Sequence, residues 1–224
     1  MLEKLRKAMK TADIDMLLIP SADPHGSEYP EEYFKARKHF SGFTGSAGTL
    51  LIWQGGAGLW TDGRYFLQAE RQLEGSGIDL FKMREPGVPT VNEFIAENIK
   101  GGVLGADLRT ISASEGMEFE KGGAILKDCR SLIDGCWEGR PELSREPAYV
   151  LPMELAGVSS SDKLGAVRAE MAKCDANACI FTDLADIAWL FNIRGNDVKY
   201  LPVALSYAIV EKQKAYIFMD AAKA

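Results

Sequence analysis

The sequence predicts an α/β fold, a mixed sheet flanked by helices, and it predicts that this fold is duplicated within the 224 residues. Amphipathic helices alternate with short apolar strands from the N-terminus onward. A glycine-rich stretch contains two of these strands with a turn between them. A helix–strand pattern then returns 162 positions later, where Met9 falls on Met171 and Asp13 falls on Asp175.

The first elements are an amphipathic helix and a buried strand. Leu2, Leu5 and Met9 recur at positions i, i+3 and i+7, which predicts a helix over residues 1–12. The apolar run at residues 16–20 is then expected to be a strand inside a sheet.

A glycine loop, residues 42–48, leads into an apolar run at residues 49–53, and a second glycine turn leads into another run at residues 59–61. This spacing predicts an antiparallel hairpin. Within the loop we expect Gly45 and Gly48 either to have positive φ or to leave no room for a Cβ.

Asp62 follows the hairpin and is expected to accept the free backbone N–H groups of a helix. That helix would carry Tyr65, Phe66, Ala69 and Leu73, which lie mostly on one face.

Further elements continue the alternation. Strands are predicted at residues 79–82 and 103–106, and capping boxes at Thr90/Glu93 and Ser112/Glu115 predict two helix starts. Prolines and charges without periodicity at residues 140–152 indicate a connection between domains. We therefore expect one domain at residues 1–150 and another at residues 151–224.

The second domain repeats the beginning of the first. Ser159 and Asp162 open a helix that is followed by a strand at residues 178–182, and a strand at residues 215–219 corresponds to residues 59–61. The first copy continues much further beyond that strand, so the second copy is expected to be incomplete.

Three blocks of sequence resemble the three-domain Xaa-Pro aminopeptidases of the creatinase and prolidase superfamily. The blocks are DPHGSEY at residues 23–29, SGFTGSAGT with WTDGRYFLQA at residues 41–69, and IAWLFNIRGNDV followed by PV and LSYAIV at residues 187–210. Long strings in a shared order are more specific than any short motif. The resemblance implies a creatinase-N-like fold for both copies.

The resemblance also implies an activity that resides outside this chain. Family members release the residue before a penultimate proline, using two metal ions, expected to be manganese, in a C-terminal pita-bread domain. We expect that domain to be absent from these 224 residues, so the segment is assigned no catalytic residue, no metal ligand and no cofactor, and is expected to be inactive alone. Xaa-Pro peptides are the implied substrates of the parent enzyme, and a homodimer is its implied assembly.

Three residues are candidates for facing the substrate. By resemblance to shorter relatives, Asp186 reaches the mouth of the active site, and the loop that contains Arg194 and Asp197 faces the catalytic domain. The alternative is structural: such charges cap helices and pair with one another or with backbone carbonyls. The family usually has Asn immediately before the PV pair, whereas this chain has Leu201, so a polar contact of that Asn is lost.

Composition and motifs exclude other classes of protein. A net charge of −6 and a pI near 5.1 argue against a nucleic-acid partner, and no apolar run approaches the ~20 residues that span a bilayer. The N-terminus lacks a signal sequence, which predicts a cytoplasmic protein. The four cysteines lack CxxC spacing and are expected to be buried thiols rather than zinc ligands or disulfides.

Two local motifs are interpreted as structural. The glycine loop leads into a strand and lacks the Lys-Ser/Thr pair of a phosphate-binding loop, and Ser46 lacks the G-x-S-x-G context of a nucleophile. His25, alone in a polar loop, is expected to be solvated or hydrogen-bonded rather than catalytic.

Two other functions are compatible with the sequence. The first is a stand-alone module that derives from such domains and binds peptide or protein without hydrolysis. The second is a fragment of a creatine-type amidinohydrolase, which the duplication disfavours because those relatives have a single N-terminal domain.

Overall fold

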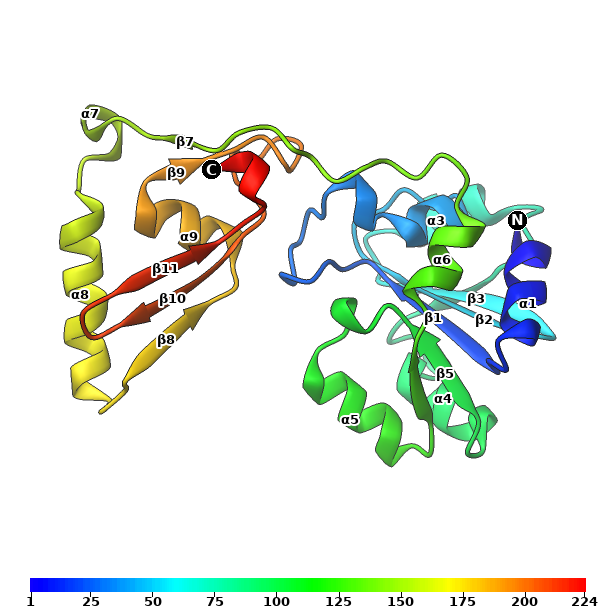
Figure 1. Ribbon diagram of the computed structural model, residues 1–224. Coiled ribbons are helices and arrows are strands. Elements are labelled where there is room, and N and C mark those ends of the chain that lie inside the picture. Colours follow the sequence, from blue (N-terminus) through cyan, green and yellow to red (C-terminus); the bar gives the residue numbers. More distant parts are fainter. The chain divides into compact units, whose positions relative to one another are not determined.

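The computed structural model describes residues 1–224 and divides into two compact units, residues 1–141 and residues 142–224 (Figure 1). The domain division expected from the sequence lies later, after residue 150. In the structure β7 (Tyr149–Val150) pairs with β9 (Ile193–Arg194) and therefore belongs to the second unit.

The first unit is built on a six-stranded mixed sheet with the order β4-β3-β2-β1-β5-β6. The strands are β1 (Met16–Pro20), β2 (Thr49–Trp53), β3 (Gly56–Thr61), β4 (Asp79–Lys82), β5 (Val103–Ala106) and β6 (Ile125–Asp128). Strand β2 pairs antiparallel with both β1 and β3. The other pairs are parallel: β4 with β3, β5 with β1, and β6 with β5. The fold class and the hairpin predicted from the sequence are confirmed.

Helices cover both faces of this sheet. They are α1 (Leu2–Thr11), α2 (Ala36–Ser41), α3 (Phe66–Leu73), α4 (Val91–Ile99), α5 (Ala113–Lys121) and α6 (Arg130–Cys136), with short 3₁₀ turns η1 (Glu32–Phe34) and η2 (Leu108–Thr110). Apolar side chains of α1, α2, α3 and α6 pack in the core on one face, and those of α4 and α5 pack on the other. Strand β1 is central and buried on both faces.

Local signals account for many of these boundaries. Both predicted capping boxes are present: Thr90 accepts from the Glu93 N–H, Ser112 accepts from the Glu115 N–H, and each glutamate accepts in return. Each box therefore satisfies two helix-end N–H groups that would otherwise lack partners.

The predicted role of Asp62 is wrong. Helix α3 begins at Phe66 and has no side-chain cap, because Asp62 lies one turn too early in the chain. Its carboxylate instead accepts the Arg64 N–H at 3.0 Å and binds the Arg64 guanidinium, which holds the pKa of Asp62 below its usual value. The sequence also did not predict α2, β6 and α6.

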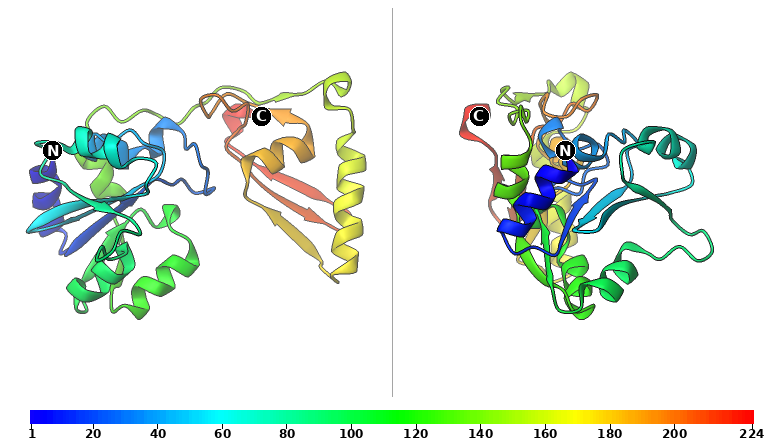
Figure 2. Two further views of the ribbon diagram at one scale, coloured as in Figure 1. Left: turned by 180° about the vertical axis from the view of Figure 1, so that it is seen from behind. Right: turned by 90° about the vertical axis from the view of Figure 1, so that its right-hand side faces the viewer.

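The second unit contains a three-stranded antiparallel sheet with the order β11-β10-β8. Its elements, besides β7 and β9, are α7 (Met153–Ala156), α8 (Ser160–Lys173), β8 (Ala178–Phe181), α9 (Leu184–Phe191), β10 (Tyr207–Glu211), β11 (Ala215–Phe218) and η3 (Ala221–Lys223). Figure 2 shows α8 lying along this sheet. No helix in the chain has both the length and the apolar character required to cross a bilayer.

The predicted repeat is confirmed at the level of backbone geometry. Two residues after the end of α1, Asp13 has a φ of 51°, and two residues after the end of α8, Asp175 has a φ of 50°. The Ile14 N–H bonds to the Met9 carbonyl at 2.9 Å, and the equivalent Ala176 N–H bonds to the Met171 carbonyl at 2.8 Å. Strands β8, β10 and β11 then pair as β1, β2 and β3 do.

Candidate functional site

Three loops meet at one end of the first sheet, and each contains a block that resembles the family. Ser21, which follows β1, donates its backbone N–H to the Gly48 carbonyl over 3.0 Å. Thr61, the last residue of β3, donates its hydroxyl to the Ala47 carbonyl over 2.7 Å. The blocks are therefore parts of one structure although they are separated in the sequence.

Arg37 on α2 holds the glycine loop in place. Its guanidinium is buried, donates to the carbonyls of Phe43 and Gly45 and to the Ser21 hydroxyl, and lies 4.9 Å from the centre of the Phe43 ring. Burial lowers its pKa to about 10, so the group stays cationic at neutral pH. The sequence analysis missed this residue, because its partners are backbone carbonyls and no acidic residue marks the site.

The loop glycines are required by close packing rather than by positive φ. A Cβ on Gly45 would lie 2.3 Å from Cζ of the fully buried Phe43, and one on Gly48 would lie 3.1 Å from the Trp60 carbonyl oxygen. Neither residue has positive φ. Of the two conditions expected from the sequence, the lack of room for a Cβ holds.

Replacing Gly45 by valine is therefore expected to lower the free energy of unfolding of the first unit by more than ~1 kcal/mol, because the added atoms overpack a closed core. Chemical unfolding in urea measures the change. Gly135 in α6 has nothing within 4 Å of its Cβ position, so Gly135→Ala is the matched control and should cost nothing. Equal unfolding midpoints for Gly45→Val and the parent chain would contradict the packing account.

The loop after β1 is organised by Asp23, which the sequence analysis did not single out. Asp23 is buried, and its Oδ1 accepts the backbone N–H groups of His25 and Ser27, each at 2.9 Å. This is an Asx turn, in which the side chain replaces a backbone acceptor. The backbone of His25 is thus part of a structural turn.

The loop after α9 in the second unit repeats the loop after α2. Helix α2 ends at Gly42 with a φ of 72°, and α9 ends at Asn192 with a φ of 52°, both left-handed. Three residues later each loop has a glycine without room for a Cβ, Gly45 in the first copy and Gly195 in the second. The two sequence blocks that carry the resemblance are therefore corresponding parts of the two copies.

Asn192 is held by a buried lysine. Lys163 on α8 donates to the Asn192 side-chain oxygen at 2.6 Å and to the Trp189 carbonyl at 2.7 Å. The Asn192 amide in turn donates to the Val158 carbonyl at 2.9 Å. A cation at the C-terminal end of α9 also complements the helix dipole.

Asp186 lies on the exposed face of α9. Its backbone N–H donates to the Asp183 carboxylate at the helix start, over 3.0 Å, but its own carboxylate makes no hydrogen bond or ion pair within the chain. Asp186 is therefore the only one of the three predicted residues whose charged group is exposed and makes no hydrogen bond or ion pair within the chain.

Arg194 is half-buried and caps the end of α9. One guanidinium nitrogen donates to the carbonyls of Ala188 and Ile193, both at 2.8 Å. These contacts match the structural alternative, in which the charge is held by backbone carbonyls.

Asp197 is fully buried and forms an ion pair with Lys223, which is also buried. The same carboxylate oxygen accepts the Leu205 N–H at 2.6 Å. The pair attaches η3 to the loop, so Asp197 supports this loop from beneath rather than from its surface.

The surface of the same loop forms an open hollow of about 350 Å³. The hollow is lined by Asn196, Val198, Lys199, Tyr200, Leu201 and Pro202. Leu201, where the family usually has Asn, thus lies on an accessible surface, and an apolar side chain replaces an amide there.

Comparison with known proteins agrees with this two-unit geometry. The family model described as the creatinase/prolidase N-terminal domain matches residues 1–136, and a second model of the same description matches residues 139–224. The chain belongs to the creatinase/prolidase N-terminal domain family. The resemblance inferred from the sequence is confirmed.

Individual members of this family match almost the whole chain. A probable Xaa-Pro aminopeptidase P of Coccidioides posadasii is 41% identical over 99% of the chain, and aminopeptidase P1 of Lotus japonicus is 40% identical over 96%. The crystal structure of the X-prolyl aminopeptidase of Caenorhabditis elegans, described as a cytosolic enzyme with a dinuclear active site, superposes with a TM-score of 0.90 at 34% identity over 99% of the chain. The chain spans 37%, 33% and 38% of these proteins, respectively.

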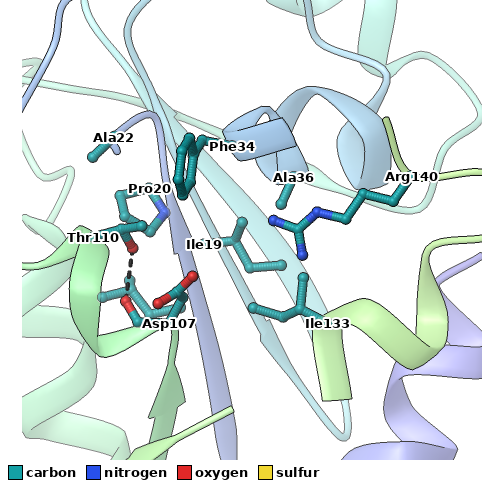
Figure 3. Close-up of a pocket in the computed structure, with 10 residues that line it drawn as sticks. Ile19, Pro20, Ala22, Phe34, Ala36, Asp107, Thr110, Ile133 and Arg140 are labelled. Atoms are coloured by element: carbon teal, nitrogen blue, oxygen red, sulfur yellow. Dashed lines mark hydrogen bonds between the residues drawn. The ribbon is translucent and has the colours of Figure 1, made fainter. Parts of the chain in front are cut away.

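The creatinase-N-like first unit also encloses a small cavity at the end of β1 (Figure 3). Its volume of about 20 Å³ accommodates a single water molecule. Arg140, which borders it, already donates to the Tyr33 carbonyl and binds the Asp134 carboxylate. The cavity is too small for a substrate.

The titratable side chains of the chain do not gather into a metal site. No group of three or more His, Cys, Asp or Glu side chains is placed to hold an ion. All four cysteines are free, and Cys129 and Cys136 are buried as expected, which raises their pKa values. The expectation of burial is wrong for Cys174, which is exposed, and for Cys179, which is half-buried.

Proposed function

We propose that this chain is the non-catalytic N-terminal region of an Xaa-Pro aminopeptidase, a metallopeptidase that releases the residue before a penultimate proline. The observation that carries the proposal is that similarity to Xaa-Pro aminopeptidases extends through both units, whereas both family models describe N-terminal domains. Two divalent metal ions, manganese on this proposal, would act in further polypeptide of the enzyme. No residue of this chain is assigned to them.

Within such an enzyme the second unit would shape substrate access. Asp186 is the residue we propose to meet the substrate, because its carboxylate is exposed and unused. Arg194 and Asp197 would act indirectly, because they hold the end of α9 and the loop of residues 196–202 in fixed positions. An acidic side chain near the substrate can bind the free α-amino group that an aminopeptidase must recognise.

The proposal also covers the substrates, the cellular location and the assembly of the enzyme. Its substrates would be Xaa-Pro peptides in the cytoplasm, and its assembly would be a homodimer to whose packing the N-terminal units contribute. The support is the similarity to an enzyme described as cytosolic, together with an acidic surface of net charge −6 that does not favour nucleic acid.

The purified chain is expected neither to hydrolyse an Xaa-Pro peptide nor to bind Mn²⁺ stoichiometrically. Mass spectrometry of Ala-Pro-Ala incubated with the chain and added Mn²⁺ tests the first point, and titration calorimetry with Mn²⁺ tests the second. Mn²⁺-dependent release of alanine that survives repurification would overturn the non-catalytic assignment. Tight binding of the intact peptide without hydrolysis would favour a stand-alone binding module instead.

A further inference from the structure

The loop of residues 196–202 has a shape that contacts within the second unit fix. The Leu201 N–H donates to the Val198 carbonyl over 3.1 Å, which closes a tight turn at the tip of the loop. The Asp197 carboxylate beneath the loop binds the buried Lys223 ammonium. The hollow on the loop surface is therefore formed in advance, and less conformational entropy is lost when a ligand binds there.

The tip of this loop is strained, and no packing within the chain offsets the strain. Tyr200 has a φ of 71°, in the left-handed region that residues with a Cβ rarely adopt. Its side chain gains little from folding, because Tyr200 is 89% exposed and its ring contact is with the Lys199 ammonium, 5.0 Å from the ring centre. Strain of this kind gathers at sites that bind ligands.

The hollow has walls of two kinds. Leu201, which is 41% exposed, and Pro202 present apolar surface. Lys199 contributes an exposed ammonium that forms no ion pair within the chain. The volume of about 350 Å³ lies in the range of sites for small ligands. Such walls suit an apolar group that stands next to a carboxylate.

The hollow lies beside the helix that carries Asp186. Val198, which lines the hollow, packs in one cluster with Leu184 and Ala188 of α9. Asp186 offers an unused carboxylate and Lys199 an unused ammonium, and the two ends of a short peptide carry the opposite charges. An extended tripeptide is about 10 Å long, close to the diameter of one helix, so its ends can contact neighbouring elements.

We propose that the hollow is the subsite for the residue that follows the proline of the substrate. Leu201 and Pro202 contact the apolar side chain of this residue, and Lys199 binds its free carboxylate. The preferred substrates are then tripeptides Xaa-Pro-Yaa in which Yaa is apolar and is the last residue. The inference rests on the proposed function, because it assigns a further part of the same substrate.

The test is the substrate selectivity of the full-length enzyme, with kcat/KM measured for Ala-Pro-Leu, for its C-terminal amide and for Ala-Pro-Asn. The parent enzyme is expected to prefer the free acid over the amide, and leucine over asparagine, which is polar but similar in size. Lys199→Met is expected to reduce the preference for the acid about threefold, the effect of an exposed ion pair. Leu201→Asn is expected to reduce the preference for leucine about tenfold. Each variant should leave the other preference unchanged.

Lys212→Met is the matched control for a general effect of charge. Lys212 is exposed like Lys199 but lies in the turn between β10 and β11, at the opposite end of β10 from the loop (Figure 1). Its replacement should change neither preference. Lys199 and Leu201 are also exposed, so their variants should unfold at the urea midpoint of the parent enzyme.

The possible outcomes separate this inference from the proposed function. Hydrolysis of the peptides with both preferences unchanged in Lys199→Met and Leu201→Asn would overturn the inference and leave the proposed function standing. Unchanged preferences together with a lowered urea midpoint would also overturn it, because further polypeptide of the enzyme would then cover the hollow. Release of alanine from none of the three peptides would overturn the proposed function and the inference with it.

Discussion

Replacing Arg37 by methionine is expected to lower the free energy of unfolding of the first unit by about 3 kcal/mol or more. The substitution keeps a long apolar side chain but removes every donor, so the carbonyls of Phe43 and Gly45 lose their partner inside the protein. A buried acceptor left without a partner costs ~1–3 kcal/mol. Urea unfolding followed by tryptophan fluorescence measures the loss, since Trp137 lies in the same core as Phe43.

Arg64→Met is the matched control for this prediction. Arg64 is exposed, and its partners, Asp62 and the ring of Tyr65, are its close neighbours in the chain, so its loss should leave the midpoint unchanged within error. If both variants unfold at the midpoint of the parent chain, the buried guanidinium does not hold the glycine loop and water or a local rearrangement replaces it.

Asp197→Ala is expected to destabilise the second unit by ~3–5 kcal/mol. The substitution leaves Lys223 as a buried ammonium without its carboxylate, and the Leu205 N–H loses its acceptor. Breaking a buried pair costs this much because the remaining charge is uncompensated. Hydrogen exchange at β10 and β11, or urea unfolding of the second unit, provides the measurement.

The double substitution Asp197→Leu with Lys223→Met distinguishes a buried pair from a general loss of packing. With both charges gone, most of the stability should return, since apolar replacements of a buried pair are often neutral. A double variant as unstable as Asp197→Ala would show that the cost comes from the shape of the site and not from the unpaired charge.

Features with a local signal in the sequence could be predicted. The capping boxes at Thr90 and Ser112 need only residues within one helical turn, and the strands of the hairpin are apolar runs bounded by glycines. The repeat was visible because Met9 and Asp13 recur as Met171 and Asp175 at the ends of two similar helices. In the structure both aspartates adopt left-handed backbone. Such features can be predicted from neighbouring residues alone, without knowledge of distant contacts.

Features that depend on distant partners could not be predicted. Helix α2 is six residues long, and its sequence ARKHFS shows no apolar stripe because its buried Arg37 is polar. The cations of Arg37, Lys163 and Lys223 bind groups that folding alone brings near them, most of them carbonyls that every residue possesses. Asp62 was misassigned because an Arg64 two residues away offered a closer partner than the helix start.

The three candidate residues of the site likewise differ in their distant partners, which the sequence does not show. The resemblance named Asp186, Arg194 and Asp197 together as candidates for facing the substrate. The structure gives Asp197 a buried lysine and Arg194 two carbonyls, and leaves the Asp186 carboxylate at the surface. Only three-dimensional partners separate a charge that supports a loop from one that is available to a substrate.

The most direct test of the account is the kcat/KM of the full-length enzyme that carries this region, measured per folded molecule with an Xaa-Pro peptide. Asp186→Ala is predicted to lower kcat/KM at least tenfold, about 1.4 kcal/mol of transition-state binding, without moving the urea midpoint. Asp197→Ala should do the reverse, lowering the midpoint while each folded molecule keeps its kcat/KM. Unchanged kcat/KM for Asp186→Ala in a fully folded enzyme would contradict the claim that this N-terminal region faces the substrate.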